Sequence, residues 1–217
     1  MTISNFMKKS GKYIARLTYN GNGWQSPSCK DGKCKSTGKK PLYEETAGFG
    51  WEEWLFCPEN RIEENGIIYQ YGFLQCFNNN AFNEEITYGQ VYLHTRKCDA
   101  KNSTKGVFYV VAKIENLIRL SKKDADFINQ TFQENGNFAR MRNDDCVKKG
   151  HFDAGPKPGP YKINTKFKVD EVWIVTPQTE IKPINYWFKI VELIEKKPKH
   201  KELLDVLEKK TTYTKLK

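Results

Sequence analysis

Segments dense in β-branched and aromatic residues recur along the chain, and they constrain its fold more than any other feature of the sequence. Such residues favour strands, because their side chains pack well on a pleated, half-buried surface. In the first segment Tyr13, Ala15, Leu17 and Tyr19 fall on one face by alternation. The pattern predicts about five strands, within residues 12–20, 66–77, 86–95, 106–117 and 169–177.

Helical patterns are confined to the middle and the end of the chain. Residues 121–136 begin with Ser121 as a helix N-cap and place Asp124 in the first turn. Two further helical patterns lie near the C-terminus and are split at Pro198, because proline interrupts a helix. Together these patterns predict an α+β fold with a mixed, barrel-like sheet. The expected division is one domain over residues 1–182 and a helical C-terminal extension over residues 183–217.

Charge is distributed unevenly along the sequence. The net charge is +10, and residues 1–43 hold nine Lys or Arg against one acid, whereas residues 44–86 hold nine Glu and one Arg. Basic surfaces attract polyanions, and contacts to phosphate dominate the affinity of proteins for nucleic acid. The distribution favours a nucleic-acid partner, with a basic solvated surface as the alternative.

The sequence also bears on location. The N-terminal stretch MTISNFMKKSGKY has no apolar segment of the kind that a secretory signal contains. The longest apolar run, VFYVVA at residues 107–112, is far too short to cross a bilayer. We therefore expect a soluble, cytoplasmic protein with no membrane partner.

Six cysteines are scattered along the chain without a C-x-x-C pair. Cys29 and Cys34 could supply half of a zinc site, but only the loose pair of His94 and Cys98 could complete it. Structural zinc needs four convergent ligands, and disulfides are rare in the cytoplasm. The sequence therefore favours free thiols over a zinc site or a disulfide, and no metal is expected.

Residues 48–56, GFGWEEWLF, place two tryptophans around two glutamates in an otherwise polar chain. In a helix Trp51, Trp54 and Leu55 would share one face, whereas in a strand Trp51 and Trp54 would face opposite sides; in both cases the glutamates lie beside the rings. Aromatic rings stack on bases for about 1–3 kcal/mol each, and a base taken out of a duplex is held between such rings. Packing in the core is the alternative for each ring. The candidate base-binding residues are Trp24, Trp51, Glu53, Trp54, Tyr69, Tyr71 and Phe73.

Two basic segments are candidates for phosphate contacts. One is a Gly-, Ser- and Lys-rich loop, and long loops of this kind inside compact domains are usually functional or disordered. The other follows the predicted middle helix. A solvated surface without a ligand is the alternative for both. The candidate phosphate-binding residues are Lys30, Lys33, Lys35, Lys39, Lys40, Arg140 and Arg142.

Signals for catalysis are weak. Asp170 followed by Glu180 and Lys182 has the outline of a metal-dependent nuclease site, but this pattern is common in a chain with 29% charged residues. The three histidines are isolated, and no nucleophile elbow, P-loop or H-x-x-x-H zinc pair is present. We therefore expect no catalytic residues and no cofactor in this chain.

The stretches YEETAGFGWEEWLF (43–56), YGFLQ (71–75) and VFYVVAKIENL (107–117) resemble the specificity domains of bacterial modification-dependent restriction systems. Those reader domains belong to the PUA-like superfamily, which includes the EVE, ASCH and YTH domains, and they flip out a modified base. The resemblance implies a small twisted mixed β-barrel with an aromatic cage, in which Trp51, Trp54 and Trp24 would be walls. The chain has neither the histidines of an HNH nuclease nor a motor, so these activities would reside in a partner or another domain.

The resemblance and the residue patterns together lead to one functional prediction. The chain is expected to be a DNA-binding specificity domain of a modification-dependent restriction system. It would flip a modified, typically methylated, base of double-stranded DNA into an aromatic cage, with a nuclease or an NTPase as candidate partner. The alternatives are an RNA-binding PUA-like module and a small metal-dependent nuclease.

Overall fold

The computed structural model describes residues 7–29, 33, 49–77, 83–98, 106–148, 163–183 and 189–216. Its strands are β1 (Met7–Leu17), β2 (Arg61–Glu64), β3 (Ile67–Gly72), β4 (Ile86–Cys98), β5 (Gly106–Arg119), β6 (Thr165–Lys168), β7 (Val172–Ile181), β8 (Val191–Glu192) and β9 (Tyr213–Lys215). Its α-helices are α2 (Lys122–Glu134), α3 (Asn137–Arg142) and α5 (Pro198–Asp205). Short 3₁₀ or π-helical turns are η1 (Trp51–Trp54), η2 (Pro58–Asn60), η3 (Gln75–Phe77), η4 (Val169–Glu171) and η5 (Val206–Lys210).

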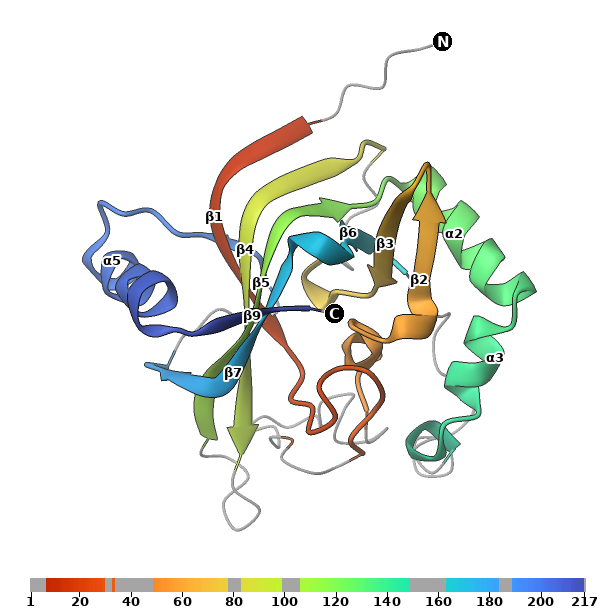
Figure 1. The fold of residues 1–217 in the computed structure, drawn as a ribbon, viewed down its shortest axis with the longest axis horizontal. Helices are drawn as coiled ribbons and strands as arrows, with labels where there is room; N and C mark the ends of the chain where they lie inside the picture. The colour runs from red at the N-terminus through yellow and green to blue at the C-terminus, as the bar shows by residue number, and fades with distance from the viewer. Residues whose placement is uncertain are drawn as a thin grey trace, which may run out of the picture.

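Nine strands form one mixed sheet (Figure 1). Their order is β2-β3-β6-β5-β4-β1-β8, and β7 pairs with both β5 and β9. Strand β1 runs parallel to β4, whereas the other described pairs are antiparallel. The α+β class is therefore confirmed. Within the described ranges the sheet is not closed, because β2 and β8 lie at the two ends of this order, so the expected barrel is not confirmed.

Alternation along the long strands separates two parts of the core. On β1, Ala15 and Leu17 pack with β4 and β5 in one hydrophobic cluster. Ile14 lies on the other face of β1, in a cluster with Tyr92 of β4 and Leu204 of α5. This is the division that a side-chain period of two imposes on a strand.

A tight hairpin joins β2 to β3. Asn65 and Gly66 form its loop with φ of 52° and 79°, the left-handed region that a two-residue type I′ turn requires. The turn places Ile62 directly opposite Tyr69. The strand pattern of the sequence predicts β3 but not β2, although an Asn-Gly pair between two such segments is a strong hairpin signal.

Helix α2 begins and packs as its sequence predicts. The Ser121 side chain accepts a hydrogen bond from the Asp124 backbone N–H at 3.1 Å. Ile128 and Phe132 face a third hydrophobic cluster, whereas Phe127 is 71% exposed. The helix therefore packs on the core with one face and leaves the large apolar side chain of Phe127 exposed.

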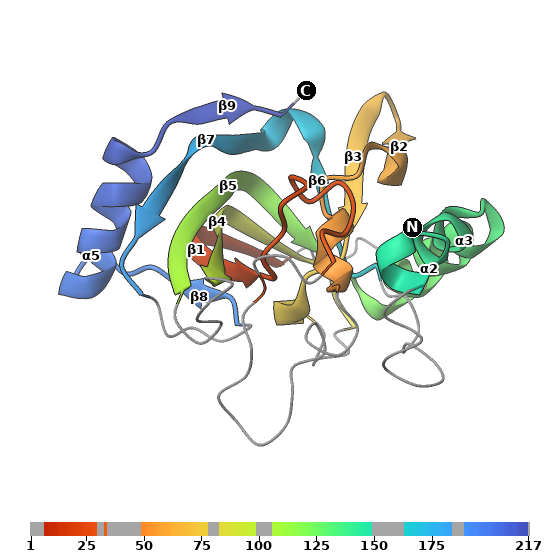
Figure 2. The same ribbon diagram turned by 90° about the horizontal axis from the view of Figure 1, so that it is seen from below.

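The C-terminal segment packs back onto the sheet. Leu204 and Leu207 belong to the same cluster as Ile14, and β9 pairs with β7. Helix α5 and helices α2 and α3 lie at opposite sides of the molecule (Figure 2). The helical prediction is confirmed for residues 198–210, but residues 191–192 form a strand because they pair with β1. No helix in the described ranges is both long and apolar enough to cross a membrane.

Candidate functional site

The GFGWEEWLF segment folds around a buried carboxylate. Glu53 is fully buried in η1, and its side chain accepts the backbone N–H of Gly50 at 2.7 Å. It also accepts the Asn20 side-chain amide at 2.7 Å and the Ser28 backbone N–H at 2.9 Å. Lys33 completes the group with an ion pair at 3.1 Å. Glu53 therefore anchors the loop after β1 to the core, where it has no path to a base.

Glu52 makes a second anchor of the same kind. Its two carboxylate oxygens accept the backbone N–H of Thr18 and of Gln75, each at 2.8 Å. Gly50 packs against Thr18 so closely that an added Cβ would lie 2.8 Å from the Thr18 hydroxyl. The paired glutamates thus bond to backbone amides from separate parts of the chain, which satisfies buried donors that would otherwise be costly.

The two tryptophans of η1 stack on each other. The ring centroids of Trp51 and Trp54 are 5.5 Å apart with an interplanar angle of 22°, which fits the helical alternative for this segment and not the strand. Trp54 is 2% exposed, whereas Trp51 is only partly buried. With no room for a base between them, these two rings do not form the two walls of an open cage.

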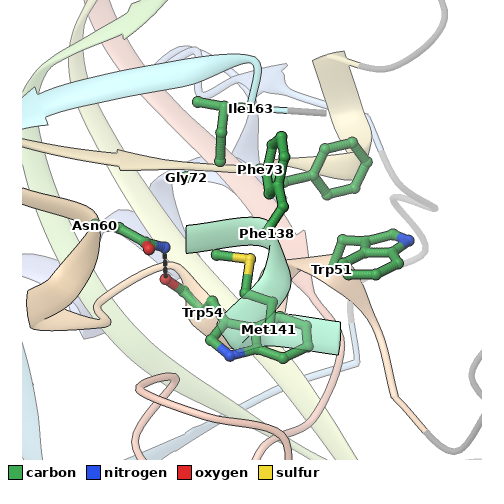
Figure 3. Close-up of a pocket in the computed structure, with 8 residues that line it drawn as sticks. All are labelled: Trp51, Trp54, Asn60, Gly72, Phe73, Phe138, Met141 and Ile163. Atoms are coloured by element: carbon green, nitrogen blue, oxygen red, sulfur yellow. Dashed lines mark hydrogen bonds between the residues drawn. The ribbon is translucent and has the colours of Figure 1, made fainter. Parts of the chain in front are cut away.

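A small depression, here called the aromatic crevice, lies beside these rings (Figure 3). Phe73 is part of its lining, and Phe138 and Met141 of α3 cover it. Its free volume is about 10 Å³, which is the space of about one water molecule. The full lining consists of Trp51, Trp54, Asn60, Gly72, Phe73, Phe138, Met141 and Ile163.

Trp24 is an anchor in the core. It is buried in the same cluster as Leu17, and its indole N–H donates to the Thr18 carbonyl at 3.1 Å. Its own carbonyl accepts the Phe56 backbone N–H at 2.9 Å. Trp24 therefore lies apart from the rings that line the aromatic crevice.

The larger opening lies between the β2–β3 hairpin and α2, and is here called the acidic groove. Its volume is about 930 Å³, in the size range of ligand sites. Tyr69 and Tyr71, both predicted site residues, form part of one wall, and Phe127 lies on the opposite one. The full lining consists of Ile62, Glu64, Tyr69, Tyr71, Asn83, Glu84, Glu85, Ile118, Leu120, Ser121, Lys123, Asp124, Phe127, Ile128, Thr131 and Lys166.

A lysine and a glutamate organise the polar part of this groove. Lys166 of β6 places its Nζ 4.7 Å from the Tyr69 ring centroid and 5.7 Å from that of Tyr71. The same Nζ pairs with Glu64 at 2.9 Å, and the Tyr71 hydroxyl donates to Glu64. Burial, followed by the neighbouring Glu64, raises the pKa of Tyr71. Tyr71 is thus a neutral donor, and the rings present their faces to a cation.

Negative charge collects around this centre. Glu84, Glu85 and Asp124 line the groove together with Glu64. Partial burial raises the pKa of Glu85, and the nearby Asp124 and Glu64 act in the same direction against Lys166. A carboxylate that is costly to ionise in the protein gains from a positive ligand.

The residues predicted to contact phosphate lie in different environments. Lys33 is buried in its ion pair with Glu53, and is therefore not available to phosphate. On α3, the Arg140 guanidinium donates to the Asn60 side chain at 3.0 Å, and Arg142 is exposed. The remaining candidates, Lys30, Lys35, Lys39 and Lys40, lie outside the described residues.

The residues of the nuclease alternative do not converge. Asp170 precedes β7, whose Val172 pairs with Ile114, whereas Glu180 pairs with Tyr109, about 17 Å further along β5 at the rise of an extended chain. Lys182 pairs with Glu202 instead. Among the described residues, no group of three or more His, Cys, Asp or Glu side chains could hold a metal ion.

Cysteine chemistry differs from the expectation of free thiols. Cys29 and Cys146, 117 positions apart, form a disulfide, and Cys98 is also disulfide-bonded. Cys57 and Cys76 are free thiols. The prediction was wrong for the bonded cysteines because their proximity is created by long-range packing, which spacing along the sequence does not reveal. Disulfides are typical of oxidising compartments, so this bond argues against the cytoplasmic location, which stays a prediction.

Sequence reasoning missed the polar residues of the acidic groove. Glu64 could have been found from the Asn-Gly turn, since a two-residue hairpin brings β2 beside the tyrosines of β3. Lys166 is the cross-strand partner of Tyr71, but β6 was not predicted. Glu85 reaches the site from a separate segment before β4 and has no local signal.

Comparison of the chain with known proteins gives no significant match to any family model, to any curated protein or to any solved structure.

Proposed function

We propose that the chain is a nucleic-acid-binding specificity domain that recognises a modified base, and that the acidic groove receives this base. The observation that supports the proposal is the half-buried ring of Tyr69 in a groove of about 930 Å³, which the buried Tyr71 also lines. Base-to-aromatic stacking contributes about 1–3 kcal/mol per base. The net charge of +10 supports attraction of the polyanion.

The groove offers the two kinds of contact that a flipped base needs. Tyr69 provides ring surface, while Glu64 and Glu85 can accept hydrogen bonds from an exocyclic amine. Phe127 provides apolar contact from α2. A methyl group can therefore enter without loss of hydrogen bonds, which is the requirement for recognising a methylated base.

The site proposed differs from the cage implied by the family resemblance. Trp54 and Glu53 belong to the buried interior, and Trp24 anchors a loop. Only the tyrosines of the predicted set line the larger opening. The PUA-like barrel, the double-stranded DNA target and a nuclease or NTPase partner stay part of the proposal. The barrel is supported by the mixed sheet with its parallel β1–β4 pair.

A binding titration tests this function. One DNA duplex is prepared with no modification, with 6-methyladenine or with 5-methylcytosine, and affinities are measured at near-physiological salt. Tighter binding to a modified duplex is expected, and Tyr69→Ala should reduce this preference by about 1–3 kcal/mol. Ile68→Ala is the matched control, because Ile68 is exposed on the other face of β3.

Equal affinity for all three duplexes would contradict recognition of these modified bases. The RNA alternative has its own signature in the same assay. Ribose at the positions flanking the base would then strengthen binding, since the 2′-hydroxyl distinguishes RNA from DNA.

A further inference from the structure

The acidic groove has the opposite charge balance to the chain as a whole. The chain has a net charge of +10, yet the groove is lined by four carboxylates and two ammonium groups. These are Glu64, Glu84, Glu85 and Asp124 against Lys123 and Lys166. Such a lining repels phosphate and favours a ligand that is itself positively charged.

The aromatic wall of the groove already holds a cation. The Lys166 ammonium lies over both Tyr69 and Tyr71, at 4.7 and 5.7 Å from their ring centroids. The faces of aromatic rings attract cations through the ring quadrupole. Tyr71 is buried, so a flat, positively charged ligand would stack on the half-buried Tyr69 ring in place of the ammonium, which pairs with Glu64 at 2.9 Å.

We propose that the groove selects a base with a positive charge on its ring, of the class formed by alkylation at a ring nitrogen. 1-Methyladenine and 3-methylcytosine are members of this class that are cationic near neutral pH. The inference rests on the proposed function, because it specifies which modified base the groove reads. Their isomers 6-methyladenine and 5-methylcytosine have the same heavy atoms but carry one proton fewer and are uncharged near neutral pH.

Three contacts give the charged base its advantage. Tyr71 is only 4% exposed and packs against Phe132, so stacking falls to the half-buried Tyr69, where it gains a cation–π component that a neutral base lacks. The carboxylates of Glu64 and Glu85 can accept from its exocyclic amine, whose hydrogen-bond donation the ring charge strengthens. Alkylation at a ring nitrogen that normally pairs also weakens the base pair, so such a base is easier to flip.

The experiment compares isomers in one duplex. Fluorescence anisotropy measures binding of duplexes with 1-methyladenine, 6-methyladenine, 3-methylcytosine, 5-methylcytosine or no modification at one position. A sixth duplex with an unmodified mismatch controls for easier flipping. Each charged isomer is expected to bind about tenfold more tightly than its neutral isomer and than the mismatch. Equal binding of the isomers would overturn the inference.

Lys166 gives the sharpest variant because the expected change is an increase in affinity. Lys166→Met removes the competing cation and should tighten binding to the charged isomers about fivefold, with little change for the neutral ones. Lys168→Met is the matched control, since Lys168 lies on the same strand but pairs with Glu171 outside the groove. Weaker binding by Lys166→Met would mean that this lysine contacts the nucleic acid, which would overturn the inference.

Free nucleosides separate this inference from the proposed function. Binding of 1-methyladenosine over 6-methyladenosine, with no preference among duplexes, would support the cation site and contradict recognition within DNA. Preference for the 6-methyladenine or 5-methylcytosine duplex over the charged isomers would support the reader function and overturn the inference. If neither nucleosides nor duplexes are distinguished, both are wrong. Thermal unfolding of each variant confirms that the protein tested is folded.

Discussion

The aromatic crevice and the acidic groove both combine aromatic rings with nearby carboxylates, yet only the groove remains open. In η1 the stacked rings of Trp51 and Trp54 fill their own space, and Glu53 is surrounded by donors from the protein. In the groove Lys166 lies directly over the rings of Tyr69 and Tyr71, and the half-buried Tyr69 borders a volume of about 930 Å³. Aromatic rings are present in both regions and therefore do not distinguish core from pocket. What differs is the set of groups that surround the carboxylates.

The largest expected effect on stability follows from removing a ring of η1, the region in which the aromatic side chains are tightly packed. Trp54→Ala should lower the free energy of unfolding by about 3–5 kcal/mol, because the side chain is buried and the surrounding core cannot fill its volume. For Tyr69→Ala the free energy of unfolding should fall by less than about half of this amount, since the Tyr69 ring is already in contact with water in the groove. Urea-induced unfolding measures both values. Similar losses for the two variants would contradict the distinction between core and groove.

The next effect concerns the buried carboxylate. Glu53→Ala should destabilise the protein by about 3 kcal/mol, because the buried ammonium of Lys33 loses its counter-ion and two backbone N–H groups lose their acceptor. Glu63→Ala, at an exposed position of β2, is the control and should stay within about 0.5 kcal/mol of the parent. Thermal and urea unfolding of the two variants checks the prediction. A Glu53→Ala variant as stable as this control would show that the carboxylate is not an anchor.

Sequence patterns predict local features of both regions, while the contacts that decide their roles are long-range. The strand periodicity of β1 and the Ser121 cap of α2 follow from neighbouring residues, and the structure confirms both. The stacking of Trp51 on Trp54 follows from helical spacing in the same way. The partners of Glu53 come from a loop more than 20 positions away, and no periodicity encodes them.

The acidic groove depends even more strongly on distant segments. Tyr71 on β3 meets Lys166 on β6, which is paired to it only through the sheet register. Glu85 arrives from the start of β4, and Phe127 from α2. The tyrosines were predicted as site residues because they share a strand face, whereas the charge that defines the groove comes from elements whose placement the sequence alone does not give.

A disulfide also holds the loop after β1, which Glu53 anchors. Removing this disulfide should have an intermediate effect on stability. The Cys29–Cys146 disulfide closes a loop of more than 100 residues and ties the loop after β1 to the segment beyond α3. The double variant Cys29→Ser, Cys146→Ser should lose about 2–4 kcal/mol of stability through the larger entropy of its unfolded state. Urea unfolding without reductant measures the loss, and nucleotide binding in the groove should persist. Loss of groove binding in a folded double variant would show that the two regions are coupled.

The smallest expected effect is a gain in stability, and it concerns Glu85 in the acidic groove. Burial, assisted by Asp124 and Glu64, raises the pKa of Glu85 above its ordinary value of 4.5. A raised folded-state pKa means that the folded protein binds this proton more tightly than the unfolded chain does. The associated stability is present below the unfolded pKa and is lost as pH rises through the folded pKa. Ionised Glu85 therefore costs stability at neutral pH.

Glu85→Gln removes this cost and should raise the melting temperature slightly at pH 7–8, with the gain disappearing below about pH 4.5. The same variant should bind the charged isomers more weakly, because a neutral amide replaces a carboxylate in the groove. Thermal unfolding at several pH values, together with the anisotropy titration, measures both changes. Stabilisation with loss of binding is the expected mark of a residue kept for a ligand rather than for the fold. A destabilised Glu85→Gln variant would place Glu85 with Glu53 as an anchor, and the two regions would no longer differ in the role of their carboxylates.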